Sequence, residues 1–476
     1  MNTHTASYHP LLALSALLSA LLFMSACSSS YSGKAEIGSD EIVVPGQPFI
    51  TLNVSSNITE DQQTQAILFI SIEEGSLIYK NQQDSLVSRI ELQVEILSEK
   101  GTPHVSDLYQ LLLGKSPDSK YYDQNTTYRR ITYNVPPGDH TAKITITDLH
   151  SGQTTTRQRE LSITDPDSDE TALSQIRFFK KTTTTDPFVA VNGYNINMGY
   201  DSLKFSFQVV NGNPEDPVEV ESRLMQFEAD LQPARSMAGR QHRRSSLVSK
   251  GIDYTKFEVL QSTKRILNTG GSVTIENAFQ DLPRGNYRFE VSANQDGEKT
   301  LYEVRDFAVK SPNYPQIKSP VELARPLYYL MNEKEYQKLL SITDPDSLKK
   351  AVDNFWLSNI KNAPKAREII KMYYERVEQA NQQFSNFKEG WKTDPGMIFI
   401  LFGPPLYVDE GFGEMTWFYE FDTGTENQGI YFEDPRFGNN KFPFHNFQLD
   451  RSSDFFGLQY RQIQSWKDGS IIYLSQ

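Results

Sequence analysis

The chain has 476 residues, a formal net charge of −13 and one cysteine, Cys27. This length exceeds what one hydrophobic core supports and corresponds to about three domains. The acidic balance argues against nucleic acid as a partner, because binding it needs positive charge concentrated on one face. A single thiol also excludes an internal disulfide framework.

The first 26 residues have the pattern of an export signal. An apolar run over residues 11–23 is too short for a membrane-spanning helix, which needs about 20 apolar residues, and has the length of a signal-peptide core. Ser25 and Ala26 directly before Cys27 resemble the lipobox of bacterial lipoproteins. Met24 stands where that family usually has Leu, and no Lys or Arg precedes the run. The resemblance implies a signal peptide over residues 1–26 and acylation of Cys27, for example with palmitate; the alternative is a plain signal peptide with an incidental cysteine.

The segment after Cys27 indicates a location. Residues 28–33 are polar and mostly small, and residues 27–36 are predicted to form a flexible tether. No Asp follows Cys27 directly, which in lipoproteins of Gram-negative bacteria implies transfer to the outer membrane. No acidic cluster marks export to the cell surface, so we expect a lipid-anchored outer-membrane protein that faces the periplasm. No later segment of the sequence is apolar enough to cross a membrane.

Residues 37–165 and 170–310 are each predicted to form a β-sandwich. In the first, Ile90, Leu92, Val94 and Ile96 alternate with polar residues, which places them on one face of a half-buried strand. The Pro, Gly and apolar positions of residues 135–144 recur at residues 282–291. Two tandem immunoglobulin-like sandwiches explain this repeat, and chance similarity of two hairpins is the alternative.

A long polar excursion runs from Asp230 to Lys250 inside the second predicted sandwich. Its basic residues can contact anionic lipid headgroups or a polyanion, and the alternative is a solvated loop. The residues that carry this idea are Arg240, Arg243 and Arg244.

Residues 320–476 are predicted to form an α+β domain. Leu348 to Trp356 follow the spacing of an amphipathic helix, with Asp346 or Ser347 as its cap. A longer helix is predicted over residues 367–384, ending near Gly390. The unbroken apolar run Met397–Phe402 is typical of a central strand buried on both faces, and two further strands are predicted at residues 415–421 and 429–432.

An ordered series of short motifs in this third part resembles the GWxTD-domain family of bacterial envelope proteins. The motifs are Tyr374-Glu375-Arg376-Val377, Gly390-Trp391-Lys392-Thr393-Asp394, Gly403-Pro404-Pro405 and Trp417-Phe418-Tyr419. The resemblance covers residues 328–432, and Pro395 departs from the basic residue expected there. Because this family has no assigned reaction, the resemblance implies location and fold more than activity.

A more local likeness involves residues 402–406, Asp409 and residues 413–421. These look like the strand–turn–strand core of the small α/β lipoprotein subunit of the barrel-assembly machinery. Convergence on a common hairpin is the alternative. If the likeness holds, it implies that the third domain is an adaptor for envelope proteins.

The candidate site residues allow a structural and a binding interpretation. In the structural one, Gly390 ends the long helix, Trp391 covers the core, and Thr393 and Asp394 bond local backbone amides before a turn at Asp394-Pro395-Gly396. In the other, Asp394 and the acidic residues Asp409, Glu410 or Glu414 face a ligand. The full candidate set is Gly390, Trp391, Thr393, Asp394, Gly403, Pro404, Pro405, Trp417 and Tyr419.

No motif in the sequence indicates a metal, a cofactor or a nucleophile. Five scattered histidines outside the signal and residues 165–170, which lack the later ligands of a calcium loop, do not predict a metal site. Carboxylate pairs such as Asp409 with Asp434 leave a hydrolytic enzyme, for example a carbohydrate-active one, as the alternative function. Our main expectation is a non-catalytic envelope scaffold that binds another envelope component through its C-terminal domain.

Overall fold

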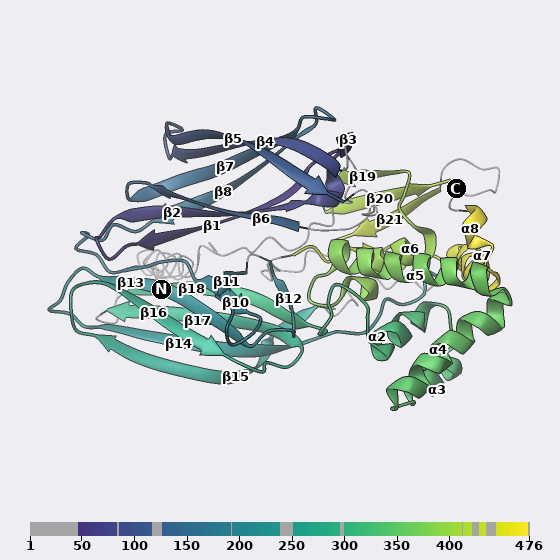
Figure 1. Ribbon diagram of the computed structural model, residues 1–476. Helices are drawn as coiled ribbons and strands as arrows, with labels where there is room; N and C mark the ends of the chain where they lie inside the picture. Colours follow the sequence, from purple (N-terminus) through teal and green to yellow (C-terminus); the bar gives the residue numbers. More distant parts are fainter. Residues whose placement is uncertain are drawn as a thin grey trace, which may run out of the picture. The chain divides into compact units, whose positions relative to one another are not determined.

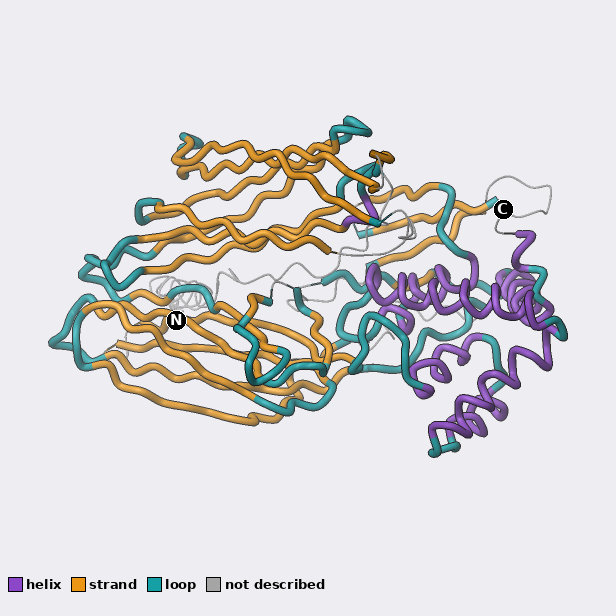
Figure 2. The backbone as a smooth tube through the Cα atoms, viewed as in Figure 1, coloured by secondary structure: helices purple, strands orange, loops and turns teal. Residues whose placement is uncertain are grey.

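The computed structural model describes residues 46–82, 85–116, 126–191, 193–238, 251–295, 299–411, 413–420, 428–434 and 444–474. Cys27 and the predicted signal and tether lie outside these residues, as do Arg240, Arg243 and Arg244. None of the described helices combines the length and the apolarity that crossing a bilayer requires. Strands dominate the chain up to Lys310, and helices are concentrated after it (Figure 2).

The first β region contains two antiparallel sheets. One has the order β1-β2-β6 and the other the order β3-β4-β7-β8, with β5 also paired to β4. A 3-10 turn, η1 (Glu74–Ser76), follows β2. The strands are β1 (Phe49–Ile58), β2 (Thr64–Glu73), β3 (Lys80–Gln82), β4 (Ser85–Ser98), β5 (Pro103–Lys115), β6 (Thr126–Asn134), β7 (Gly138–Asp148) and β8 (Thr154–Ile163).

The core of this region is built from alternate residues of both sheets. Ile90, Leu92, Val94 and Ile96 of β4 are at most 1% exposed, which confirms the predicted buried face of this strand. They form one cluster with the inward residues of β1, β2 and β7. The period of two in the sequence therefore determines which side of each strand is buried.

The second β region also contains two sheets. The first has the order β11-β10-β13-β16, with β9 paired to β13, and the second has the order β12-β18-β17-β14-β15 (Figure 1). The strands are β9 (Ala172–Leu173), β10 (Arg177–Lys181), β11 (Val189–Ala190), β12 (Asn195–Asn197), β13 (Ser202–Asn211), β14 (Val218–Ala229), β15 (Ile252–Leu267), β16 (Gly271–Phe279), β17 (Gly285–Gln295) and β18 (Lys299–Lys310).

Aromatic packing fills the core between these sheets. Phe205 stacks on Phe178 and on Phe289, with ring centroids 4.5 Å apart in both pairs. Phe307 joins the same cluster at 5.3 Å from Phe205. Such pairs contribute about 0.5–1.5 kcal/mol each beyond the burial of their area.

The sequence repeat corresponds to equivalent hairpins in the two regions. Strands β7 and β17 each have 11 residues and each begins at the repeated glycine, Gly138 or Gly285. Each pairs in antiparallel fashion with the strand that follows it. The recurring pattern of Pro, Gly and apolar positions therefore marks the same structural element twice.

The C-terminal region combines helices with a small sheet of order β19-β20-β21-β22. The helices are α2 (Pro320–Ala324), η3 (Arg325–Tyr329), α3 (Glu333–Leu340), α4 (Pro345–Ile360), α5 (Ala363–Phe384), η4 (Gly390–Lys392), α6 (Asp394–Phe402), α7 (Phe455–Asp468) and α8 (Ile471–Leu474). The strands are β19 (Tyr407–Gly411), β20 (Glu414–Tyr419), β21 (Gln428–Glu433) and β22 (Gln448–Leu449).

The predicted helices form, with longer N-terminal ends than expected. The cap of α4 is Asp344, whose side chain accepts from the Ser347 amide, rather than Asp346 or Ser347. The predicted boundary was wrong because the Pro after Asp344 occupies the first helical position, where its missing N–H costs nothing. Asn362 caps α5 in the same way.

The apolar run Met397–Phe402 is a helix and not the predicted central strand. It belongs to α6, and residues 395 to 401 of this helix are all buried. A helix that is apolar on every side is typical of a buried core element, and periodicity alone does not distinguish it from a buried strand. The Thr393 cap and Pro395 in the first turn favour the helix.

The second β region and the C-terminal region share buried surfaces. Ala234 and Met237, which follow β14, belong to the hydrophobic cluster of the C-terminal helices. Tyr194 and Phe387 form a second mixed cluster with residues of β14 and β18. The two regions are therefore joined by packing as well as by the linker that precedes α2.

The two β regions meet through the side chain of Gln208 on β13. Its Nε2 donates to the Ile58 carbonyl at 2.7 Å, and its Oε1 accepts from the Ile58 amide at 2.8 Å. Gln208 is 4% exposed, so the site is shielded from water. The side-chain amide of Gln208 thus gives the backbone N–H and C=O of Ile58 the partners that water cannot supply there.

Gln208→Leu is expected to lower the free energy of unfolding by about 2 kcal/mol, because it leaves buried polar groups of Ile58 without partners. Thermal and denaturant unfolding measure the loss. Gln110→Leu, the same change at an exposed position of β5, is the control and should leave stability within about 0.5 kcal/mol. Equal stability of the two variants would contradict the role assigned to Gln208.

Candidate functional site

The candidate residues 390–394 form the junction between α5 and α6. The Thr393 hydroxyl donates to the Gly390 carbonyl at 2.8 Å and accepts from the Gly396 amide at 3.1 Å. The predicted local hydrogen bonding of Thr393 is confirmed. Asp394-Pro395-Gly396 is the first turn of α6 and not the predicted turn before a strand, because the Thr393 cap starts the helix there.

The prediction that Gly390 ends the long helix is wrong. Helix α5 ends at Phe384, and Gly390 begins η4. A Cβ atom at residue 390 would lie 1.8 Å from the Ala380 carbonyl oxygen, so only glycine fits against α5. The Gly390 amide donates to Ser385 Oγ at 2.7 Å, which fixes this close approach.

The sequence predicts that Asp394 bonds local backbone amides, and this prediction is wrong. Asp394 instead anchors a distant segment of the chain. Its carboxylate accepts from both terminal nitrogens of Arg451, at 2.5 and 2.8 Å, and from the Leu449 amide at 2.8 Å. The side chains of Asp394 and Arg451 are 11% and 13% exposed. This bidentate, largely buried pair is the strong form of a charge-assisted hydrogen bond.

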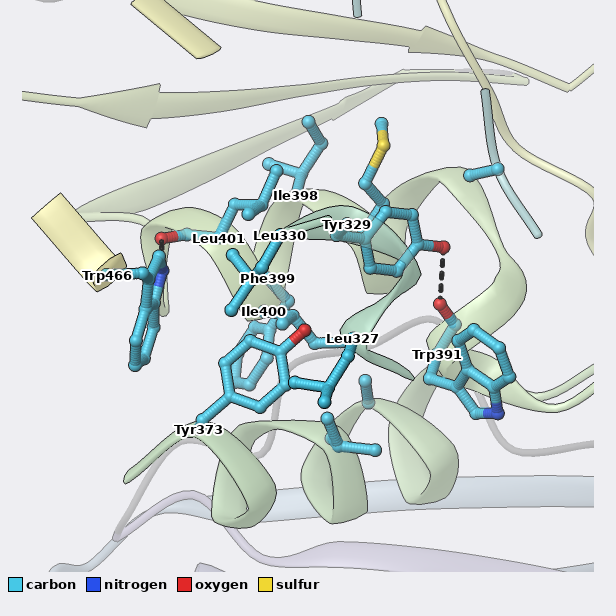
Figure 3. Close-up of a cluster of buried hydrophobic side chains, with 14 of the residues drawn as sticks. Leu327, Tyr329, Leu330, Tyr373, Trp391, Ile398, Phe399, Ile400, Leu401 and Trp466 are labelled. Atoms are coloured by element: carbon cyan, nitrogen blue, oxygen red, sulfur yellow. Dashed lines mark hydrogen bonds between the residues drawn. The ribbon is translucent and has the colours of Figure 1, made fainter. Parts of the chain in front are cut away.

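Trp391 packs into the core of the C-terminal region (Figure 3). Its side chain is in the predicted position, and the residue is 4% exposed. The Tyr329 hydroxyl donates to the Trp391 carbonyl at 2.6 Å, and the Trp391 amide donates to Asn381 Oδ1 at 3.2 Å. Both backbone groups of Trp391 are thus satisfied inside the protein.

The second group of candidate residues follows α6 in the sequence, and two of them, Gly403 and Tyr419, meet at the C-terminal end of this helix. Gly403 has a φ of 86°, which a residue with a side chain adopts only under strain, and its carbonyl accepts from the Tyr419 hydroxyl at 2.9 Å. Trp417 is fully buried, with its ring centroid 5.4 Å from that of Phe384. Pro404 is exposed and Pro405 is half-buried.

The last carbonyls of α6 face cationic and polar donors. Arg376 Nη1 donates to the Ile400 carbonyl at 3.3 Å, and its guanidinium lies 5.2 Å from the Trp466 ring centroid. Trp466 Nε1 donates to the Leu401 carbonyl at 3.0 Å (Figure 3). Burial lowers the pKa of Arg376 to about 10. A buried cation at this helix end is favoured by the partial negative charge of the unpaired carbonyls.

Six of the nine candidate residues therefore lie at two separate places. Gly390, Trp391, Thr393 and Asp394 lie at the start of α6, and Gly403 and Tyr419 meet at its end. Nine helical residues separate the two places by about 13 Å. The motifs serve as supports for the two ends of one buried helix.

A cluster of charged side chains lies beside the start of α6. Glu389, 4% exposed, pairs with Arg284 from the loop before β17 and with Lys392 Nζ at 2.6 Å. Lys310, the last residue of β18, is 3% exposed and donates to the Asn386 carbonyl at 2.7 Å. These contacts connect the second β region to the α5–α6 junction.

Burial shifts the titration of two lysines in this cluster. Burial, reinforced by Lys392 and Arg284, lowers the pKa of Lys310 well below its usual range. Burial, with Arg284 and Arg325 nearby, lowers the pKa of Lys392 to about 7. Loss of hydration disfavours the charged form of an amine, which explains the direction of both shifts.

The acidic residues of the alternative binding site lie on other elements. Asp409 is on β19 opposite Thr416, and Glu414 begins β20. Asp434 Oδ2 lies 3.0 Å from His445 Nδ1. Across the described ranges no group of three or more His, Cys, Asp or Glu residues is arranged to hold a metal ion.

Sequence reasoning missed the charged partners that fix the site. Arg376 carried a usable signal, because it stands within the motif Tyr374-Glu375-Arg376-Val377 and inside the helix predicted over residues 367–384. Arg451, Arg284 and Lys310 carried none. They are far from the motif in sequence, and only tertiary packing brings them to it.

Comparison with known proteins identifies the C-terminal part. The profile of the GWxTD domain matches residues 287–468, so the resemblance seen in the motifs is confirmed. The match starts within β17 and ends with α7, and it thus includes the β17–β18 hairpin that carries Lys310. A search of the curated proteins found no match.

Two solved structures are similar to the chain at low identity. Red sea bream transglutaminase has 9% identity and a TM-score of 0.18 over 55% of this chain and 31% of that one. Dimeric latent PorU from Porphyromonas gingivalis has 11% identity and a TM-score of 0.23 over 56% of this chain and 20% of that one. The chain thus spans under a third of either protein, and similarities this weak support no inference about fold or function.

Asp394→Asn is expected to lower the free energy of unfolding by about 2 kcal/mol, because it leaves the guanidinium of Arg451 largely buried without its carboxylate. Denaturant unfolding measures the change. Asp353→Asn removes the exposed pair with Lys349 and should cost about 0.5 kcal/mol or less. An Asp394→Asn variant as stable as this control would refute the anchoring role.

Lys310→Met is expected to flatten the dependence of stability on alkaline pH. Because the pKa of Lys310 is lowered in the folded protein, the unfolded chain binds more protons between that lowered pKa and about 10.5. The free energy of unfolding of the parent should therefore rise with pH in this window. Thermal unfolding from pH 7 to 10, with exposed Lys334→Met as control, tests this; equal slopes for parent and Lys310→Met would disprove it.

Proposed function

We propose, from the premise that residues 287–468 form a GWxTD domain, that this chain is a membrane-anchored envelope lipoprotein with a scaffolding role. The proposal places its lipid on Cys27 and its body at the periplasmic face of the outer membrane. The C-terminal domain binds another envelope component. The chain is not an enzyme in this proposal.

The observation that carries the scaffold proposal is the use of the motif residues inside the fold. Thr393 caps α6, Asp394 holds Arg451, and the Tyr419 hydroxyl bonds the Gly403 carbonyl. Catalysis needs polar groups that converge on a shared substrate position. Groups already engaged with each other, at two ends of a helix, favour a supporting role instead.

In this proposal the two β regions form a spacer between the lipid on Cys27 and the C-terminal domain. We propose that they are tandem immunoglobulin-like sandwiches over residues 37–165 and 170–310. The equivalent β7 and β17 hairpins and the core enclosed by both sheets of each region support this description. Lys310 and Arg284 of the second β region contact the Asn386 carbonyl and Glu389, which belong to the proposed C-terminal domain, residues 320–476.

The strand–turn–strand segment at β19 and β20 is our first choice for the partner surface. It follows Gly403-Pro404-Pro405 and carries the likeness to the barrel-assembly lipoprotein. Leu406 and Tyr407 are 62% and 50% exposed there. The proposal also includes a separate contact with anionic lipid headgroups, made by Arg240, Arg243 and Arg244.

Site-specific photo-crosslinking in intact cells tests the adaptor role. A crosslinking residue at Leu406 is expected to capture one envelope protein as a single predominant adduct. The control is the same residue at Leu108 on β5, which is 59% exposed in the first β region. No partner at Leu406, together with turnover of a cell-wall glycan by the purified protein, would overturn the adaptor and favour the hydrolytic alternative.

Intact-mass analysis tests the anchor independently. The mature protein extracted from membranes should begin at Cys27 and carry fatty acyl mass on that residue. Cys27→Ser should lose this mass and its membrane retention. An unmodified Cys27 would remove the lipoprotein part of the proposal.

A further inference from the structure

Helix α7 presents two large aromatic side chains to solvent. Phe456 is 68% and Tyr460 57% exposed, and they lie one helical turn apart with nearly parallel rings, 6.5 Å between centroids. Scattered exposed apolar residues are normal on protein surfaces, but an exposed pair at this spacing forms a continuous apolar strip.

The opposite side of α7 fixes the direction in which this strip points. Leu458 and Trp466 are buried in the core of the C-terminal region. Gln462 Nε2 donates to the Leu401 carbonyl at 2.7 Å, as does Trp466 Nε1 at 3.0 Å. The helix therefore cannot rotate to bury Phe456 and Tyr460 without breaking its contacts with α6.

Basic side chains accompany the aromatic strip. Arg461 is exposed next to Tyr460, and Lys467 follows in the last turn. At the end of the α7–α8 pair, Tyr473 is 72% exposed and lies 5.3 Å from Lys365 Nζ. The two acidic residues of this region, Asp454 and Asp468, stand at the two ends of α7.

The described segment that ends at Ala238 contacts the same helix. Ser236 Oγ and the Met237 amide both donate to Gln459 Oε1 on α7, at 2.6 and 3.0 Å. The described part of the chain ends at Ala238 and resumes at Gly251. The intervening sequence holds Arg240, His242, Arg243, Arg244 and Lys250 without an acidic residue.

We propose that the face of α7 formed by Phe456, Tyr460 and Arg461 binds an anionic phospholipid surface. Aromatic rings place an apolar body below the headgroups with a polar edge in water, and arginine meets the phosphates. Lys467 in the last turn of α7 and Lys365 beside Tyr473 add positive charge that attracts an anionic surface. The inference rests on the proposed lipid anchor, which keeps the protein at a membrane, and it gives the C-terminal domain a second contact with that membrane.

Vesicle co-sedimentation tests the proposal with the mature chain, residues 27–476, carrying Cys27→Ser so that no acyl chain contributes. The parent should bind vesicles containing phosphatidylglycerol and bind pure phosphatidylcholine vesicles much less. Phe456→Ser with Tyr460→Ser should weaken binding to the anionic vesicles about tenfold, since two aromatic contacts are lost. Leu340→Ser with Leu357→Ser, 37% and 45% exposed on α3 and α4, is the matched control and should bind like the parent.

A fluorescent variant provides a second readout that does not depend on loss of binding. All four tryptophans are at most 4% exposed, so Phe456→Trp adds an exposed reporter. Its emission should shift to the blue with anionic vesicles and be quenched by brominated lipid.

Two results would overturn the assignment. One is parent-like binding by the Phe456→Ser, Tyr460→Ser variant with no blue shift of Phe456→Trp. The other is loss of binding only when Arg240, Arg243 and Arg244 are replaced, which would assign the contact to the basic segment. Crosslinking at Leu406 and the mass of Cys27 are unaffected by either result, so the adaptor and the anchor are judged separately.

Discussion

Helix α6 is apolar on every side, and the C-terminal region is organised around the need to satisfy its ends away from water. A buried helix leaves amides at its start and carbonyls at its end without partners, and each costs free energy if left unpaired. At the start of α6, Thr393 accepts a hydrogen bond from the Gly396 amide. At its end, Arg376, Gln462 and Trp466 donate hydrogen bonds to the last carbonyls. The GWxTD motif is, in this protein, the N-terminal part of that arrangement.

The same requirement links the motif to distant parts of the chain. Asp394 reaches from the first turn of α6 to Arg451, and Arg451 also donates to the carbonyls of Arg235 and Ser236 after β14. One carboxylate thereby orders a segment of the C-terminal region that in turn contacts the second β region. The domain match that begins inside β17 is consistent with this shared construction.

Burial also has an electrostatic consequence at this junction. Arg284 and Lys392 pair with the carboxylate of Glu389, and both cations repel the buried Lys310, which is costly at a site shielded from water. The lowered pKa values of the two lysines are the expected response. The two buried lysines therefore link the folding of this junction to proton release.

The sequence by itself determined the features that depend on local periodicity: the buried face of β4, the equivalent hairpins at Gly138 and Gly285, the long helices and the motif that identifies the GWxTD domain. Only the tertiary structure decided that Met397–Phe402 is a helix, since an unbroken apolar run has no period and its conformation follows from what surrounds it. It also decided the partners of Asp394 and Lys310, because ion pairs and buried hydrogen bonds join residues whose separation in sequence carries no signal.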